Sequence, residues 1–205
     1  SKEGGTGGNG GSGDNEGNKK PDNDKKTEEK RKDDRKVTEP AIGTVSVDAE
    51  KDGKDGTISV NITEAHISQA VQAAKDAAAD RDVNAGDISI KIQVTFEEDG
   101  SDENRVNHLK VNLSSEVQKQ MKDNKISRVT FAAEKPGISV GLDLNAVVAV
   151  NDQAKGDVQL VITCADSTKL SGEAQVAIGS RPAFELNILY GSDQQMITDF
   201  GSGKM

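Results

Sequence analysis

Two acidic stretches of the sequence carry the side chains best suited to bind a metal ion. Together, "DAEKDGKDG" and "EEDGSDEN" supply nine carboxylates: Asp48, Glu50, Asp52, Asp55, Glu97, Glu98, Asp99, Asp102 and Glu103. Calcium takes six to eight oxygen ligands from groups of this kind. Neither stretch has the alternating acids, the central glycine and the distal glutamate of an EF-hand loop. We therefore interpret both as solvated hairpin loops, and we expect no metal site and no cofactor.

For nucleophilic catalysis the chain offers one cysteine and two histidines. Cys164 stands near the end of an apolar stretch, where a cysteine usually serves as a small packed side chain. A nucleophile needs a positioned base, but His66 lies at the start of an expected helix and His108 leads an expected strand. We therefore assign no catalytic role to these three residues.

The sequence also lacks the motifs expected for phosphate binding and for sugar hydrolysis. The sequence "GSGK" at Gly201 to Lys204 lacks the glycine four residues earlier and the following helix of a phosphate loop, so we predict a turn. A pair of catalytic carboxylates for sugar hydrolysis needs a cleft, usually with aromatic walls. The chain has no tryptophan, one tyrosine and four phenylalanines, so a stacking platform for sugars is not expected. We predict no catalytic, cofactor-binding or metal-binding residue.

The elements that would position these residues follow a repeated pattern. The sequence contains three similar stretches in which an expected strand runs directly into an expected helix. Apolar residues alternate about Val60, Val111 and Val140, as in a strand with one buried face. Each strand is followed by an expected N-cap: Thr63, Ser114 and Asp143. Apolar residues then recur at helical spacing: Ile67, Ala70, Val71, Ala74, Ala78, Val117, Met121, Leu144, Val147 and Val148. We expect these helices to end near Asp80, near Asp123–Asn124 with the asparagine as a left-handed cap, and before Gly156.

A further strand follows each helix, so the chain repeats a strand, helix, strand unit. Residues 107–164 read β-α-β-β-α-β, with a tight turn at Pro136–Gly137. That order is compatible with a ferredoxin-like sheet, although the helices are short for full crossovers. After a short helix or turn that ends at Gly179, a strand is expected at 183–190 and a partial strand from 195.

We therefore predict an α+β fold of two layers. It combines a mixed or mostly antiparallel sheet with short capped helices on one face. A β-sandwich with short helical insertions is the alternative.

Residues 1–40 differ in composition from the rest of the chain. They contain no Phe, Tyr, Leu or Ile, and their ten basic and ten acidic residues cancel. Such a segment buries too little apolar surface to offset its ordering entropy, so we predict a disordered linker. The net charge of −9 therefore belongs to 41–205, which argues against nucleic-acid binding. We expect 41–205 to be a single domain with an ordered core at about 56–200.

Several motifs of this region resemble a domain of cell-surface proteins from Gram-positive, Clostridia-like bacteria, where it often precedes S-layer-homology repeats. The similar stretches are "LKVNLSSEVQKQM", "ISVGLDLNAVVAV", "GDVQLVITCAD" and "LSGEAQVAIGSRPAFELNILYGSDQQMITDFGSGK". The resemblance covers roughly 56–204 and is strongest at Leu170 to Pro182 and Asp199 to Gly203. It implies no catalytic residue. It also implies that another strand follows Gly203, so we expect the domain to be truncated at Met205.

The resemblance implies a non-enzymatic structural or spacer module at the bacterial cell surface, held by the cell wall or by a lipoprotein tether. We expect a monomer that reaches cell-wall polymer or other surface domains through parts outside this chain. No stretch approaches the ~20 apolar residues of a membrane-spanning helix. The alternatives are a binding module for protein or glycan and an accessory domain of a larger surface hydrolase.

Overall fold

The computed structural model describes residues 41–53, 56–80, 88–97, 106–134 and 137–205. The predicted disorder of 1–40 lies outside these residues. So do Asp55, Pro136 and most of the second acidic stretch: Glu98, Asp99, Asp102 and Glu103.

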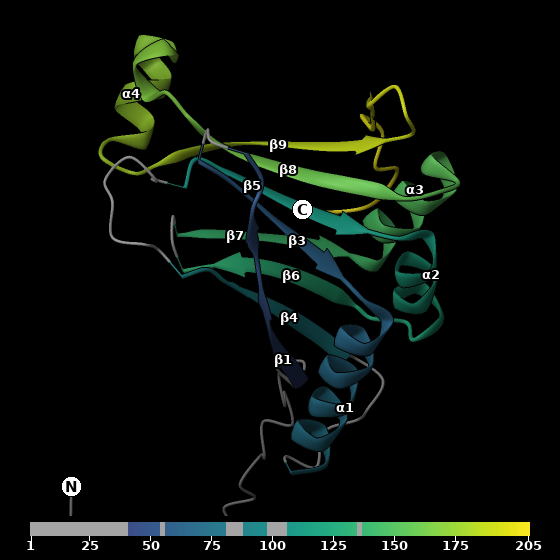
Figure 1. The fold of residues 1–205 in the computed structure, drawn as a ribbon. Helices are drawn as coiled ribbons and strands as arrows, with labels where there is room; N and C mark the ends of the chain where they lie inside the picture. Colours follow the sequence, from purple (N-terminus) through teal and green to yellow (C-terminus); the bar gives the residue numbers. More distant parts are fainter. Residues whose placement is uncertain (1–40, 54–55, 81–87, 98–105, 135–136) are drawn as a thin grey trace, which may run out of the picture. The chain divides into compact units, whose positions relative to one another are not determined.

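The described strands form two mixed sheets (Figure 1). The four-stranded sheet has the order β1-β4-β6-β7, with β1 (Ala41–Asp48), β4 (Ile88–Thr95), β6 (Arg128–Ala133) and β7 (Ile138–Asp143). The six-stranded sheet has the order β10-β9-β8-β5-β3-β2, with β10 (Gln195–Met196), β9 (Ala183–Tyr190), β8 (Val158–Ala165), β5 (His108–Leu113), β3 (Thr57–Ile62) and β2 (Glu50–Lys51). Parallel pairs are β1–β4, β4–β6 and β3–β5, and the remaining neighbours are antiparallel. The predicted α+β class with mixed sheets is confirmed.

The helices begin and end close to their predicted positions. They are α1 (Glu64–Asp80), α2 (Ser115–Asp123), α3 (Leu144–Ala154) and α4 (Gly172–Ile178), with a 3₁₀ turn at Ser167–Lys169. The Val117 N–H donates to Ser114 Oγ at 3.2 Å, and the Ala146 N–H donates to Asp143 Oδ1 at 2.8 Å, which confirms two predicted caps.

The left-handed residue after α2 differs from the prediction. The residue with positive φ is Lys125, whereas Asn124 is right-handed. The third helix ends before Gly156, as predicted, and Lys155 is the left-handed residue there. The asparagine near the end of α2 therefore predicted the end of the helix but not the residue with positive φ.

The ferredoxin-like arrangement expected as one option for 107–164 is wrong. β5 and β8 are antiparallel neighbours in the six-stranded sheet, whereas β6 and β7 form a hairpin in the four-stranded sheet. α2 has nine residues and is ~13 Å long, so it is too short to return the chain along a strand of the same sheet. Instead, α1, α2 and α3 each connect a strand of one sheet to a strand of the other, and all three begin at the same end of the strands (Figure 1).

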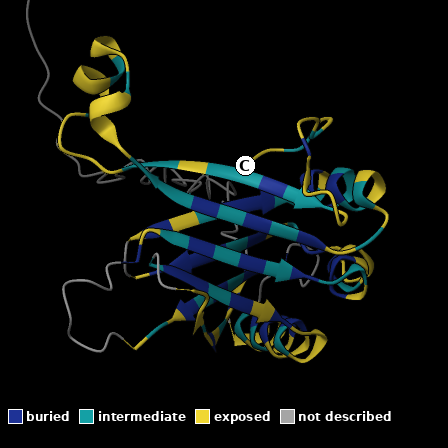
Figure 2. Cartoon of the chain, turned by 45° about the horizontal axis from the view of Figure 1, so that its top comes forward, coloured by how far each residue is buried: buried dark blue, intermediate teal, exposed yellow. Residues whose placement is uncertain are grey.

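One cluster of buried apolar side chains joins both sheets and three helices. It includes Ile58, Val60, Leu109, Val111, Leu160, Ile162 and Ile188 from the six-stranded sheet, Ile90, Ile92, Val129, Phe131 and Leu142 from the four-stranded sheet, and Ile67, Val71, Val117, Met121 and Val147 from the helices. Figure 2 shows the resulting alternation of buried and less buried residues along the strands. Each such side chain stabilises the fold by ~1.5–3 kcal/mol, so this cluster dominates its stability.

β1 begins before the predicted core of 56–200. It pairs with β4 along its whole length, and α1 packs against it. Ala41, Gly43 and Val47 are buried, whereas Ile42 on the opposite side is 55% exposed. β1 therefore extends the four-stranded sheet and forms part of the surface on which α1 lies.

Residues 166–182, which we name the arm, stand away from the sheets between β8 and β9 (Figures 1 and 2). α4 lies within the arm, ends at Gly179 as predicted, and has no buried residue. The arm is held by its own hydrogen bonds: Gln175 donates to the Leu170 carbonyl at 2.8 Å, and Arg181 donates to the Ala177 carbonyl at 2.9 Å.

Candidate functional site

Two of the described acidic residues, Asp48 and Asp52, each hydrogen-bond to a residue on a strand. The Lys110 ammonium donates to Asp52 at 2.8 Å across the six-stranded sheet. The Thr95 hydroxyl donates to Asp48 at 2.5 Å. Among the described residues there is no group of three or more His, Cys, Asp or Glu side chains that could hold a metal ion.

The two histidines make different structural contacts. At the start of α1, the Thr63 N–H donates to His66 Nδ1 at 3.2 Å, and the His66 N–H donates to Thr63 Oγ1 at 3.3 Å, so the two residues cap the helix reciprocally. His108 Nδ1 lies 3.0 Å from Thr163 Oγ1, directly opposite on β8. Sequence reasoning missed this second pair because 55 residues separate its members.

The contact between His108 and Thr163 resembles the first half of a nucleophile and base arrangement. Such an arrangement also needs a third group that orients the base. Within the described residues, no carboxylate hydrogen-bonds to the His108 ring. Cys164, the adjacent residue, is half-buried on β8 and pairs in register with Phe184. The geometry of His108 and Thr163 is that of a cross-strand hydrogen bond.

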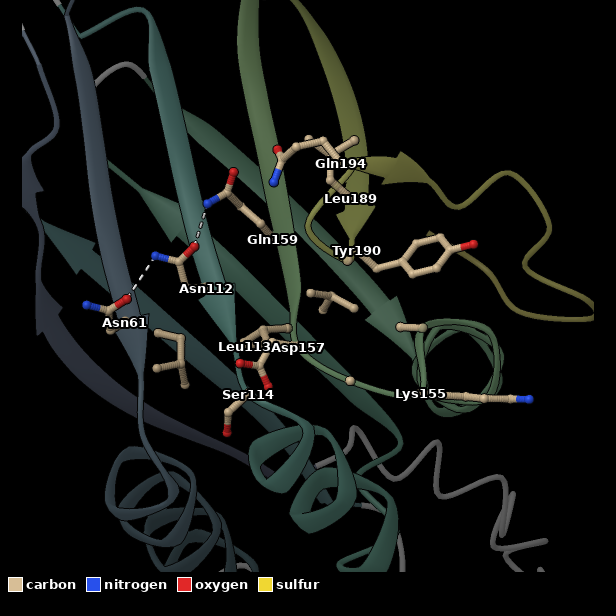
Figure 3. A pocket seen from close by; sticks show the side chains of 15 residues that line it. Asn61, Asn112, Leu113, Ser114, Lys155, Asp157, Gln159, Leu189, Tyr190 and Gln194 are labelled. Carbon is tan, nitrogen blue, oxygen red and sulfur yellow. Dashed lines mark hydrogen bonds between the residues drawn. The ribbon is translucent and has the colours of Figure 1, made fainter.

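A groove of ≈ 660 Å³ opens where the outer face of the six-stranded sheet meets the helices (Figure 3). Its floor is formed by residues of β3, β5, β8 and β9. Its walls are the start of α2, the loop from α3 to β8, and the turn from β9 to β10. The ring of Tyr190 and the side chain of Lys155 point away from the floor (Figure 3).

Three side-chain amides form a row across the floor, which we name the amide ladder: Asn61, Asn112 and Gln159. Gln159 Nε2 donates to Asn112 Oδ1 at 2.7 Å, and Asn112 Nδ2 donates to Asn61 Oδ1 at 2.8 Å (Figure 3). Asn112 Nδ2 also donates to Ser59 Oγ at 3.0 Å. In the described part of the chain, no residue hydrogen-bonds to Asn61 Nδ2 or Gln159 Oε1. The ladder therefore presents a donor at β3 and an acceptor at β8.

Part of the amide ladder could have been predicted from the sequence. Asn61 and Asn112 each follow the central valine of the first two strand-to-helix turns. In the structure, Val60 pairs with Val111 and Asn61 with Asn112, because β3 and β5 are parallel neighbours in that register. The third turn has Gly141 at the matching position and lies in the other sheet.

Beneath the groove, the side chain of Gln118 joins two backbone segments, residues 113–114 and the loop at Gly156. This side chain is 1% exposed. Nε2 donates to the carbonyls of Leu113, Ser114 and Gly156 at 3.2, 3.2 and 2.9 Å. This contact fixes the end of β5 against the loop that precedes β8, and so shapes one wall of the groove.

The perturbed carboxylates of the described residues lie at turns of the backbone. The pKa of Glu116 in the first turn of α2 is lowered by hydrogen bonds from its own backbone N–H and then from Ser115 and Ser114. The pKa of Asp166 is lowered by hydrogen bonds from the Thr168 hydroxyl and the Thr168 backbone N–H. Both shifts arise from local capping geometry and indicate no catalytic pair.

The "GSGK" sequence forms the predicted turn. The Gly201 N–H donates to Asp199 Oδ1 at 2.8 Å. The Lys204 carbonyl accepts from the Asp143 N–H at 3.0 Å, so this segment is attached to the end of β7.

No protein-family model matches the chain, and no curated protein and no solved structure matches it either. Among the described helices, none has both the length and the apolar character needed to cross a membrane.

Proposed function

We propose that this chain is a non-enzymatic structural module, a spacer that separates other parts of a bacterial surface protein. The proposal places it outside the cell, attached through the cell wall or a lipoprotein tether. It acts as a monomer, contacts no nucleic acid, and meets cell-wall polymer or other surface domains through parts outside this chain.

This role is supported most strongly by the contacts of the histidine and aspartate side chains, the residue types best suited to catalysis, because these side chains hydrogen-bond within the fold. His66 caps a helix, and His108 bonds to the hydroxyl of Thr163. The carboxylates of Asp48 and Asp52 bond to neighbouring strands. Side chains that are hydrogen-bonded in this way contribute to the stability of the fold.

A single core shared by two sheets also suits a spacer. Because side chains from both sheets and three helices belong to one cluster, the sheets are expected to unfold together. A module that resists partial unfolding keeps its neighbours at a fixed separation. The location at the cell surface rests on the resemblance of the motifs at 56–204 to surface-protein domains.

A domain exchange tests the spacer role. In the surface protein that carries this chain, residues 41–205 would be replaced by an unrelated folded domain of similar size. A spacer predicts unchanged surface display and unchanged activity of the attached domains. Loss of cell-wall attachment, or of a hydrolytic activity that only the original chain restores, would overturn the proposal.

A matched variant separates the hydrolase alternative from a loss of folding. The double substitution His108→Ala and Thr163→Val removes the one imidazole–hydroxyl contact between strands in the described residues. The spacer role predicts that this variant supports every activity of the parent protein. A catalytic role of His108 and Thr163 within a hydrolase would instead leave the variant displayed normally but inactive.

A further inference from the structure

We propose that the groove binds a neutral, hydroxyl-rich glycan, which lies across β3, β5 and β8 along the amide ladder. This inference goes beyond the spacer role and does not depend on it.

The chemistry of the floor matches hydroxyl groups. An amide supplies both donors and acceptors, and a sugar hydroxyl can serve as either. The internal bonds of the ladder occupy Asn112, but they leave Asn61 Nδ2 and Gln159 Oε1 available. Chains of hydrogen bonds polarise one another, so the free donor and the free acceptor at the two ends are strengthened.

The spacing of the ladder favours a glycan over an extended peptide. Asn61, Asn112 and Gln159 stand on neighbouring strands in direct register, and neighbouring strands lie ~4.8 Å apart. A pyranose unit in an extended glycan is about as long as this interstrand distance, so two sugar units span the two strand spacings between Asn61 and Gln159, which carry the available groups. An extended peptide presents side chains to one face only every second residue, at ~6.7 Å, and would fall out of register with the ladder.

The charge of the groove selects against anionic glycans. Of the described residues that line the groove, only Lys155 and Asp157 carry charged side chains, and their formal charges sum to zero. Asp157 also accepts a hydrogen bond from the Ser115 N–H at 2.9 Å. The remaining lining is uncharged, in a chain whose net charge is −9. An anionic polymer would be repelled by the negative net charge of the chain. The side chain of Lys155 points away from the floor (Figure 3), so it would not lie against a polymer bound along the amide ladder.

Among the described residues of the lining, no aromatic ring lies on the floor, because the Tyr190 ring points away from the amide ladder (Figure 3). Binding then depends on hydrogen bonds that replace bonds to water, which makes the net gain from each one small. We therefore expect weak affinity for a short oligosaccharide and stronger apparent binding to a polymer that offers many copies of the same unit.

The test is an NMR titration of the full chain that follows the side-chain amide signals of Asn61, Asn112 and Gln159. The probes are cellopentaose and chitopentaose as neutral glycans, pentagalacturonate as an anionic glycan, and a neutral peptide of β-forming residues. We expect saturable shifts of the ladder signals with a neutral glycan at concentrations up to ~10 mM, which detects millimolar dissociation constants.

Two single variants and one control test whether the glycan contacts the amide ladder. Asn61→Ala and Gln159→Ala each remove one free end and are expected to weaken binding about fivefold. Asn187→Ala is the control, because Asn187 lies on the same sheet, bonds to Glu185 at 2.9 Å and is outside the groove lining. Three results would overturn the proposal: no saturable shift with either neutral glycan, equal or tighter binding of pentagalacturonate or the peptide, or folded Asn61→Ala and Gln159→Ala variants that bind like the parent chain.

Discussion

Gly43 on β1 lies directly against Ala70 on α1, with no room for a side chain between them. A Cβ atom at position 43 would collide with the Ala70 carbonyl oxygen and the Ala74 backbone nitrogen, and would come within 2.9 Å of the Ala70 carbonyl carbon. Because Gly43 pairs with Ile90 on β4, this close approach also sets how α1 lies over the parallel pair of strands.

Gly43→Ala is therefore expected to destabilise the protein by ~1–3 kcal/mol, the usual cost of overpacking, because the obstacle is backbone that cannot rotate away. Urea unfolding would measure the change. Gly172→Ala is the matched control, since nothing lies within 4 Å of a Cβ at that helical position, and it should be neutral or slightly stabilising. Equal unfolding midpoints for Gly43→Ala and the parent chain would mean that α1 does not pack as described.

Gln118→Leu tests the buried amide beneath the groove. It keeps the size of the side chain but removes the donor to the carbonyls of Leu113 and Gly156, whereas the Ser114 carbonyl still accepts from the Gln118 backbone N–H. It also removes the buried Oε1, which has no partner among the described residues. We expect a loss of ~1–3 kcal/mol in the free energy of unfolding. The exposed Gln72→Leu on α1 removes only a surface bond to Asp76 and should change stability by less than ~0.5 kcal/mol. If the two variants are equally stable, Gln118 does not hold these segments.

The lowered pKa of Asp166 predicts a pH dependence confined to the arm. A carboxyl whose pKa is lower in the folded state contributes stability above its unfolded pKa, and that contribution is lost as the pH falls from about 4 through the folded pKa. An NMR titration of the Asp166 carboxyl measures the folded pKa. Thr168→Val removes the hydroxyl that donates to Asp166 at 2.6 Å, so the pKa should rise toward its ordinary value. Thr44→Val on β1 should leave the pKa unchanged.

Calcium is expected to leave the stability of the chain unchanged. Asp48 and Asp52 already bond to Thr95 and Lys110, and the sequence of both acidic stretches lacks calcium-ligand spacing. Thermal unfolding with millimolar calcium and with a chelator checks this expectation. A melting temperature several degrees higher with calcium would reveal a site, because a ligand that binds only the native state stabilises it.

Local features of the fold could be predicted because they depend on neighbouring residues. Period-two alternation gave the strands around Val60, Val111 and Val140, and the caps Ser114 and Asp143 gave the starts of two helices. These features need only a few consecutive residues.

The assignment of each strand to one of the two sheets could not be predicted, because the sequence of a strand does not indicate which sheet it joins. β1 was missed for a related reason. Its glycine and exposed Ile42 obscure the alternation, and only its contact with α1 explains Gly43. The groove was missed because Asn112 and Gln159 are 47 residues apart and only the sheet brings them together.

The most direct test of the central claim, that polar groups able to do chemistry serve the structure instead, is a double-mutant cycle on His108 and Thr163. Unfolding free energies would be measured for the parent chain, His108→Ala, Thr163→Val and the double variant. Each single variant should be less stable than the parent, and the two residues should be coupled by ~0.5–1.5 kcal/mol. Zero coupling would contradict it, as would a single variant more stable than the parent, which is the behaviour of a site where activity is gained at the expense of stability.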